Sequence, residues 1–160
     1  MSYVFIVCTV DVMVGGLFGT VASITNRKKA FHINILKIRL TKNLIPDPLI
    51  RDDQALVVNI SDKGLVILTG CGHAGIINTI NYANKITGID RIHAIIGGFH
   101  LSADDGIFEA AIEPTLKEFQ KVQPDYLVPC HCTGWKATNR IIETMPEKFI
   151  QSSVGTTFQF

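Results

Sequence analysis

Three apolar segments of this chain each lead into a loop that carries a histidine. The segments run over 64–68, 92–96 and 126–128, and the histidines that follow them are His73, His100 and His131. Apolar runs of this kind predict buried strands, and loops at the carboxyl ends of neighbouring strands meet at one edge of an α/β sheet. Imidazole nitrogens that meet there can bind a divalent metal or move protons. The pattern predicts a shared centre built from these three residues.

The loop around His73 is rich in glycine and joins a predicted strand directly to a predicted helix. Gly70, Gly72 and Gly75 permit tight turns and a close approach of a ligand to the backbone. The start of a helix carries a partial positive charge, which disfavours the imidazolium ion and favours the neutral, metal-binding imidazole. The alternative is that His73 is simply a polar turn residue.

Cysteines flank two of the histidines and leave two further interpretations open. Cys71, Cys130, Cys132 and one histidine could form a closed structural zinc site, and a Cys–His pair could supply a nucleophile. Adjacent residues of an extended segment point in opposite directions. We therefore expect Cys130 and Cys132 to face away from His131 and to pack in the interior.

The remaining pattern predicts alternating strands and helices. Turn residues 61–64 predict a hairpin, and Gly88 predicts the end of the first helix. Pro114 suits the first turn of a second helix, and Thr133 could cap a third. The predicted strands are 31–40 at a sheet edge, 55–60, 65–68, 91–96, 126–128 and one or two within 149–160; the predicted helices are 76–86, one from 114 and 134–143.

The first 24 residues are almost continuously apolar and need a separate interpretation. Residues 3–24 are long enough for a membrane span. Asp11 near the middle opposes insertion by about 2.5–3.5 kcal/mol, and the glycines at 15, 16 and 19 add no hydrophobicity. We therefore expect a buried strand, a glycine turn and a second apolar element, with the membrane span as the alternative.

Composition narrows the classes of function. The chain has 160 residues, of which 47% are hydrophobic and 18% charged, so it is one globular domain or part of one. The net charge is +1, and no basic run is longer than 27–29, so the sequence predicts no basic surface for binding nucleic acid. The four cysteines include no Cys-x-x-Cys pair, which predicts a reducing, cytoplasmic location.

Four motifs in order resemble the carboxyl half of a metallo-β-lactamase-fold hydrolase, on the branch of the dihydropterin-ribofuranosylaminobenzene phosphate synthases. The motifs are Asp-Asp-Gln-Ala-Leu at 52–56, Thr-Gly-Cys-Gly-His-Ala-Gly-Ile-Ile-Asn at 69–78, Gly-Gly-Phe-His-Leu at 97–101 and Pro-Cys-His-Cys-Thr-Gly at 129–134. The resemblance implies an αββα sandwich with a metal site, here zinc, at the edge where its two sheets meet. It places His73 and His131 on metal ligands, and His100 where many relatives have a bridging aspartate.

The sequence departs from this family at its beginning. The resemblance covers residues 46–160, and the family's His-x-His-x-Asp-His signature is absent. Gly15-Gly16-Leu17 resembles the segment that follows the signature, and alignment there puts Cys8, Val10, Val12 and Met13 at the ligand positions. We therefore expect residues 1–45 to be a degenerate remainder and the chain to be a truncated or degenerate metal-binding hydrolase with a small-molecule substrate and little activity of its own.

The half-fold also predicts a partner. Half of a sandwich leaves the inner face of its sheet uncovered, and apolar surface of that size is rarely left in water. We expect residues 1–45 to cover this face, or self-association or a partner chain to do so. A non-catalytic association subunit built on the half-fold is accordingly the alternative function.

Overall fold

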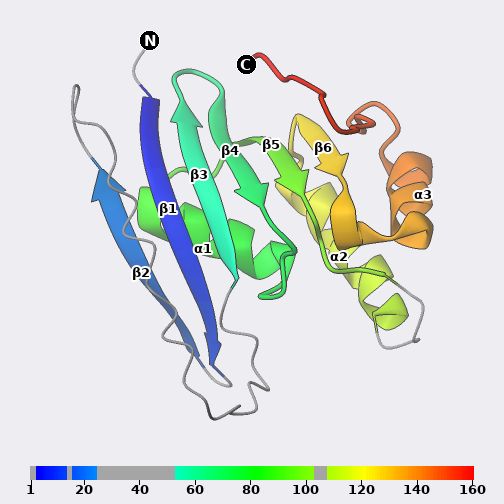
Figure 1. Ribbon diagram of the computed structural model, residues 1–160, viewed down its shortest axis with the longest axis horizontal. Helices are drawn as coiled ribbons and strands as arrows, with labels where there is room; N and C mark the ends of the chain where they lie inside the picture. Colours follow the sequence, from blue (N-terminus) through cyan, green and yellow to red (C-terminus); the bar gives the residue numbers. More distant parts are fainter. Residues whose placement is uncertain (1–2, 14–15, 25–52, 103–107) are drawn as a thin grey trace.

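A six-stranded sheet forms the centre of the protein (Figure 1). The computed structural model describes residues 3–13, 16–24, 53–102 and 108–160, the first two ranges by their backbone alone. The strand order is β2-β1-β3-β4-β5-β6. The strands are β1 (Tyr3–Met13), β2 (Gly16–Ile24), β3 (Gln54–Ile60), β4 (Gly64–Thr69), β5 (Ile92–Gly97) and β6 (Tyr126–Pro129).

The sheet changes from antiparallel to parallel pairing at β4. Strands β2, β1, β3 and β4 pair antiparallel, whereas β5 is parallel to β4 and β6 is parallel to β5. A parallel pair needs a crossover, and helices supply both crossovers. The carboxyl ends of β4, β5 and β6 therefore lie at the same edge of the sheet.

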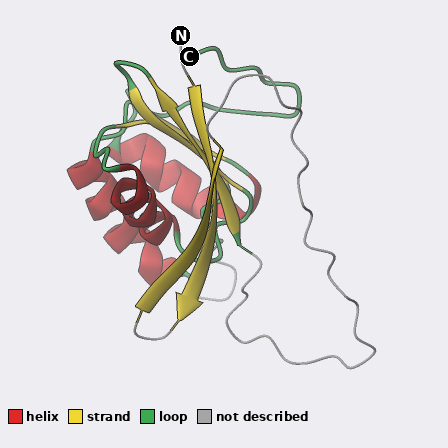
Figure 2. Ribbon diagram, turned by 90° about the vertical axis from the view of Figure 1, so that its left-hand side faces the viewer, coloured by secondary structure: helices red, strands yellow, loops and turns green. Residues whose placement is uncertain are grey.

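Three helices cover one face of the sheet (Figure 2). They are α1 (Ile76–Thr87), α2 (Glu109–Val122) and α3 (Trp135–Thr144). Their apolar sides enter one core with β3–β6, in which Ile80, Phe119 and Ile141 are fully buried. This helical layer and its sheet form one αβ half of the four-layer sandwich that the family resemblance implies.

Most of the elements predicted from the sequence are confirmed. The hairpin β3–β4 turns at 61–63, where Asp62 adopts a positive φ of 66°. Helix α1 ends at Gly88, whose left-handed backbone lets its N–H donate to Asn84 O. The predicted pair of apolar elements within 3–24 is the hairpin β1–β2, and β1 also pairs with β3. No helix in the described ranges is long and apolar enough to cross a membrane.

Three local predictions are wrong. Pro114 lies inside α2 rather than in its first turn, because the helix begins at Glu109. Thr133 does not cap α3; Gly134 occupies that position. Residues 149–160 contain no regular strand, only an isolated bridge from Phe149 to Leu127. The strand predicted over 31–40 and the boundary at 45/46 lie outside the described residues.

An acidic group far from the histidine loops anchors the amino end of β5. His93 Nδ1–H donates to Asp125 Oδ2 over 2.7 Å, and Arg91 approaches the same oxygen at 3.4 Å. The His93 hydrogen bond, assisted by the charge of Arg91, lowers the pKa of Asp125 below its ordinary value. The folded state therefore favours the carboxylate, which stabilises the fold above the unfolded pKa of about 3.9 and loses this effect as pH falls through the lower folded pKa.

Asp125→Asn should accordingly make the free energy of unfolding fall less steeply as the pH is lowered into the acidic range. Because this side chain is 36% exposed, we expect the substitution to lower the free energy of unfolding at neutral pH by less than about 1 kcal/mol. Urea unfolding at several pH values between neutral and strongly acidic measures the effect, with the exposed Asp90→Asn as a charge-matched control. If the free energy of unfolding fell equally steeply with acid in the wild type and in Asp125→Asn, this role would be contradicted.

Candidate metal centre

The three loops that carry the predicted site residues lie together at the carboxyl edge of the parallel strands. His73 follows β4, His100 follows β5 and His131 follows β6. The predicted convergence of these loops is therefore present in the fold. What each histidine contacts within this edge differs from one loop to the next.

Backbone and threonine hydrogen bonds tie the three loops to one another. Gly98 N–H donates to Gly70 O, and Cys130 N–H donates to Gly97 O, each over 2.9 Å. The Phe99 N–H donates to Thr133 Oγ1 over 3.1 Å, and this hydroxyl donates in turn to Cys130 O. Thr133 therefore joins the β5 and β6 loops instead of capping a helix. Hydrogen bonds of this kind between loops hold side chains in fixed positions, as a metal or catalytic site requires.

A buried carboxylate positions the His73 loop. Asp53 is 6% exposed, and its Oδ2 accepts the Ala74 N–H over 2.9 Å, immediately before α1. A carboxylate beside a helix amino terminus is also favoured by the helix dipole. The sequence pattern gave this residue no role, because its partner lies 21 residues away. Its only sequence signal was its place in the first of the four family motifs.

His73 and His100 contact each other. Their ring centroids are 4.6 Å apart and the rings are nearly perpendicular, at 80°. His100 adopts a positive φ of 49°, which is uncommon for residues other than glycine and tends to be kept at functional sites. The backbone therefore places this imidazole against His73 at a conformational cost. Asp104, the nearest carboxylate after His100 in sequence, lies outside the described residues.

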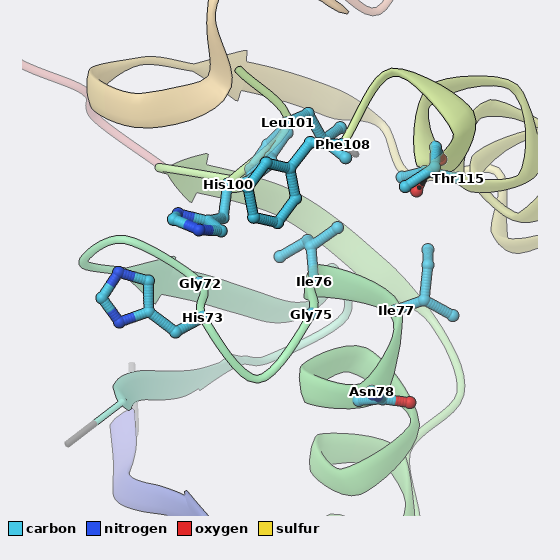
Figure 3. A pocket seen from close by; sticks show the side chains of 12 residues that line it. Gly72, His73, Gly75, Ile76, Ile77, Asn78, His100, Leu101, Phe108 and Thr115 are labelled. Atoms are coloured by element: carbon cyan, nitrogen blue, oxygen red, sulfur yellow. Dashed lines mark hydrogen bonds between the residues drawn. The ribbon is translucent and has the colours of Figure 1, made fainter. Parts of the chain in front are cut away.

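A small apolar pocket adjoins these two histidines (Figure 3). Its volume is about 200 Å³, and its walls come from the His73 loop, the start of α1, the loop after β5 and α2. In Figure 3 the rings of His73 and His100 lie together at one end, whereas Ile77 and Thr115 lie at the other. Phe108 packs against His100 with a centroid distance of 4.6 Å. The pocket therefore has two imidazole rings at one end and mainly apolar walls elsewhere.

His131 lies with two cysteines. Cys71 Sγ is 3.3 Å from His131 Nδ1, and the Cys132 thiol donates to Cys71 O over 3.0 Å. The donor atoms of Cys71, His131 and Cys132 all lie within 4.8 Å of one another. Among the described residues, these are the three His, Cys, Asp or Glu side chains whose donor atoms lie close enough together to hold one metal ion.

The expected orientation of Cys132 is therefore wrong. That expectation assumed an extended segment, but residues His131–Thr133 form a 3-10 turn, in which neighbouring side chains no longer alternate. Burial raises the pKa of the Cys132 thiol, and the nearby Cys71 adds to the rise. A thiol with a raised pKa is a poor nucleophile, which disfavours the Cys–His interpretation for this residue.

The basic residues that follow His131 form ion pairs between helices. Lys136 pairs with Glu109, and Arg140 Nε donates to Glu113 over 2.8 Å, so both connect α3 to α2. Trp135 is 76% exposed and does not pack in the core. Lys136 and Arg140 are therefore engaged with carboxylates of α2 on the solvated surface of the two helices.

No family model matches this chain, whereas curated proteins and solved structures do. The 7,8-dihydropterin-6-methyl-4-(β-D-ribofuranosyl)-aminobenzene-5′-phosphate synthase of Methanocaldococcus jannaschii is 35% identical over 109 residues, which are 68% of this chain and 36% of the relative. An uncharacterised protein of that organism is 34% identical over 106 residues, 66% of this chain and again 36% of the relative. The chain thus spans about a third of the length of these curated relatives.

A solved structure supports the same assignment. The crystal structure of Tm1679, a metal-dependent hydrolase of the β-lactamase superfamily, matches with a TM-score of 0.63 and 32% identity over 72% of this chain and 43% of that one. The order of the four motifs, the sheet with its helical layer and these matches all agree. Over the matched part of its length, the chain therefore belongs to the metallo-β-lactamase superfamily, on the branch of the dihydropterin-ribofuranosylaminobenzene phosphate synthases.

Proposed function

We propose that this chain binds a divalent metal, zinc by preference, at the carboxyl edge of β4, β5 and β6. The observation that carries the proposal is the set of hydrogen bonds that fixes the three histidine loops against one another. His73, His100 and His131 are the ligands that the family resemblance assigns, and they remain predictions. Loops held this firmly are suited to a small ion, whose ligands must keep their positions to within about 0.5 Å.

The chemistry of the donors fits zinc. Imidazole nitrogen and thiol sulfur are the donors that zinc favours, whereas magnesium and calcium favour carboxylate and carbonyl oxygen. Asp53, the buried carboxylate near this edge, is engaged with the Ala74 backbone. A zinc ion bound here would polarise a substrate oxygen and lower the pKa of a bound water. The protein would contribute fixed loops and the apolar pocket beside His73 and His100.

We further propose that these 160 residues have little hydrolytic activity of their own. The sequence contains no His-x-His-x-Asp-His segment, the part that supplies most first-half ligands in the family that it resembles. A metal held by fewer ligands binds more weakly and leaves the reactive water poorly positioned. The substrate class we propose is a small molecule, by analogy with a relative named as a dihydropterin-ribofuranosylaminobenzene phosphate synthase and a solved structure named as a metal-dependent hydrolase.

The sheet face opposite the helices favours association as a second function. A hollow of about 370 Å³ lies there, lined by apolar strand residues Val58, Ile60 and Val66 and by the carboxyl-terminal residues Phe158 and Phe160. Leu68 in the same hollow is 37% exposed. A non-catalytic subunit that associates through this face would not need to retain a metal.

Metal content separates the two functions. We expect purified protein to contain zinc, and His73→Ala and His131→Ala to lower the affinity by at least about 10-fold, the lower end of what even outer-shell changes cause. Elemental analysis with a competing chelator measures this, and His93→Gln, which removes an imidazole away from the edge, is the control. Unchanged metal content in both edge variants would overturn the assigned roles, and wild-type protein that binds no metal would favour association.

A further inference from the structure

We propose that Cys71, His131 and Cys132 form a binding site for a thiophilic divalent cation of the zinc class. The inference rests on the proposed function and deepens it, because it adds two sulfur donors beside the imidazole of His131. His73 and His100 line the adjoining pocket. The argument depends on distances, on the backbone that sets them and on the chemistry of the donors.

The donor atoms lie close to the spacing that a metal requires. In a tetrahedral zinc site with bonds of about 2.0–2.3 Å, neighbouring donor atoms are about 3.5–3.8 Å apart. Cys71 Sγ and His131 Nδ1 are 3.3 Å apart, and every pair in the cluster lies within 4.8 Å. The spacings of the cluster therefore lie close to those of a tetrahedral site.

The backbone holds these side chains in place. Gly98 leaves the space into which Cys132 projects, since a Cβ there would lie only 2.8 Å from Cys132 Sγ. His131 has a positive φ of 50°, an uncommon conformation that persists only where the surroundings enforce it. The loops that carry Cys71 and Cys132 are each hydrogen-bonded to the β5 loop between them. The cluster is therefore built by the fold rather than formed by mobile surface residues.

The chemistry of the cluster selects one class of ion. Two thiolates balance the charge of a dication, and sulfur ligands favour zinc and cadmium over magnesium and calcium. A Cys₂His set leaves one position open for water or a substrate, as in catalytic zinc sites. Metal binding would release the protons of both thiols, including the one that the Cys132 thiol now donates to Cys71 O. His131 is exposed, so the open position can reach solvent.

Cobalt substitution tests the site directly. Metal-free protein with reduced thiols is titrated with Co²⁺, and a sulfur-to-cobalt charge-transfer band in the near ultraviolet reports thiolate ligands. We expect this band to saturate at one equivalent and to disappear when Zn²⁺ is added. Cys71→Ser and Cys132→Ser should each weaken the band and lower the affinity by at least about 10-fold.

Two variants outside the cluster are the controls, and the cobalt spectrum distinguishes this inference from the proposed function. Cys130→Ser alters the neighbouring cysteine, whose sulfur is outside the cluster, and should leave the band unchanged. His93→Gln, which alters an imidazole that pairs with Asp125 away from this edge, should also leave it unchanged. Cobalt bound without a charge-transfer band would overturn the thiolate site while leaving metal binding intact. A protein that binds no cobalt would contradict both proposals, and circular dichroism confirms that each variant is folded.

Discussion

Replacing Gly98 by alanine is expected to destabilise the protein by about 1–3 kcal/mol, the range typical of overpacking a tight interior. A Cβ at this position would lie 2.6 Å from Gly70 O and 2.8 Å from Cys132 Sγ. The carbonyl is part of the backbone and accepts the Gly98 N–H, so it cannot move without disturbing the β4 and β5 loops. The same substitution should therefore also weaken metal binding at the cysteine cluster.

Gly70→Ala is the matched control for this prediction. Gly70 lies at the other end of the same hydrogen bond, but a Cβ there would meet nothing within 4 Å. We expect its free energy of unfolding to change by no more than about 0.5 kcal/mol. Urea denaturation of both variants, followed by cobalt titration, measures the two effects. Equal stability of Gly98→Ala and Gly70→Ala would show that the three loops are less tightly packed than the geometry indicates.

The strands and the first helix could be predicted because their signals are local. Apolar runs bounded by turn residues mark β3, β4, β5 and β6, and helical spacing ended by Gly88 marks α1. The convergence of the histidine loops followed from one further rule, that parallel strands present their carboxyl ends at one edge. Local signals and this rule together predicted the edge of the sheet at which the three histidine loops lie.

The contacts within the site could not be predicted, because they depend on residues far apart in sequence and on local backbone geometry. Cys71 and His131 are 60 residues apart, and only the pairing of β4, β5 and β6 brings them together. Cys132 joins them because the chain forms a 3-10 turn instead of continuing the strand. Pro114 was misplaced for a similar reason: packing of α2 on the sheet outweighs the local preference of proline for a first turn.

Removal of the Asp53 carboxylate is the second change expected to have a large effect. Asp53→Ala leaves the Ala74 N–H without its acceptor, and both residues are buried, at 6% and 5% exposure. A buried donor left unsatisfied costs about 1–3 kcal/mol. Because Ala74 directly follows His73, the loop should also lose its fixed position. We therefore expect lower stability together with weaker packing of His73 against His100.

Asp53→Asn keeps a hydrogen-bond acceptor for the Ala74 N–H and removes the negative charge, so it tests the two contributions separately. Its amide oxygen can still accept the Ala74 N–H, so only the attraction of a full charge to the start of α1 is lost, an effect of about 0.3–1 kcal/mol. Urea denaturation ranks the variants, and the histidine ring proton resonances of His73 and His100 report their mutual contact. A milder loss in Asp53→Asn than in Asp53→Ala, with the ring shifts preserved only in the former, is the expected result. If Asp53→Ala kept wild-type stability and ring shifts, the carboxylate would have no part in positioning the loop, and the fixed placement of His73 would have to come from the glycine hydrogen bonds alone.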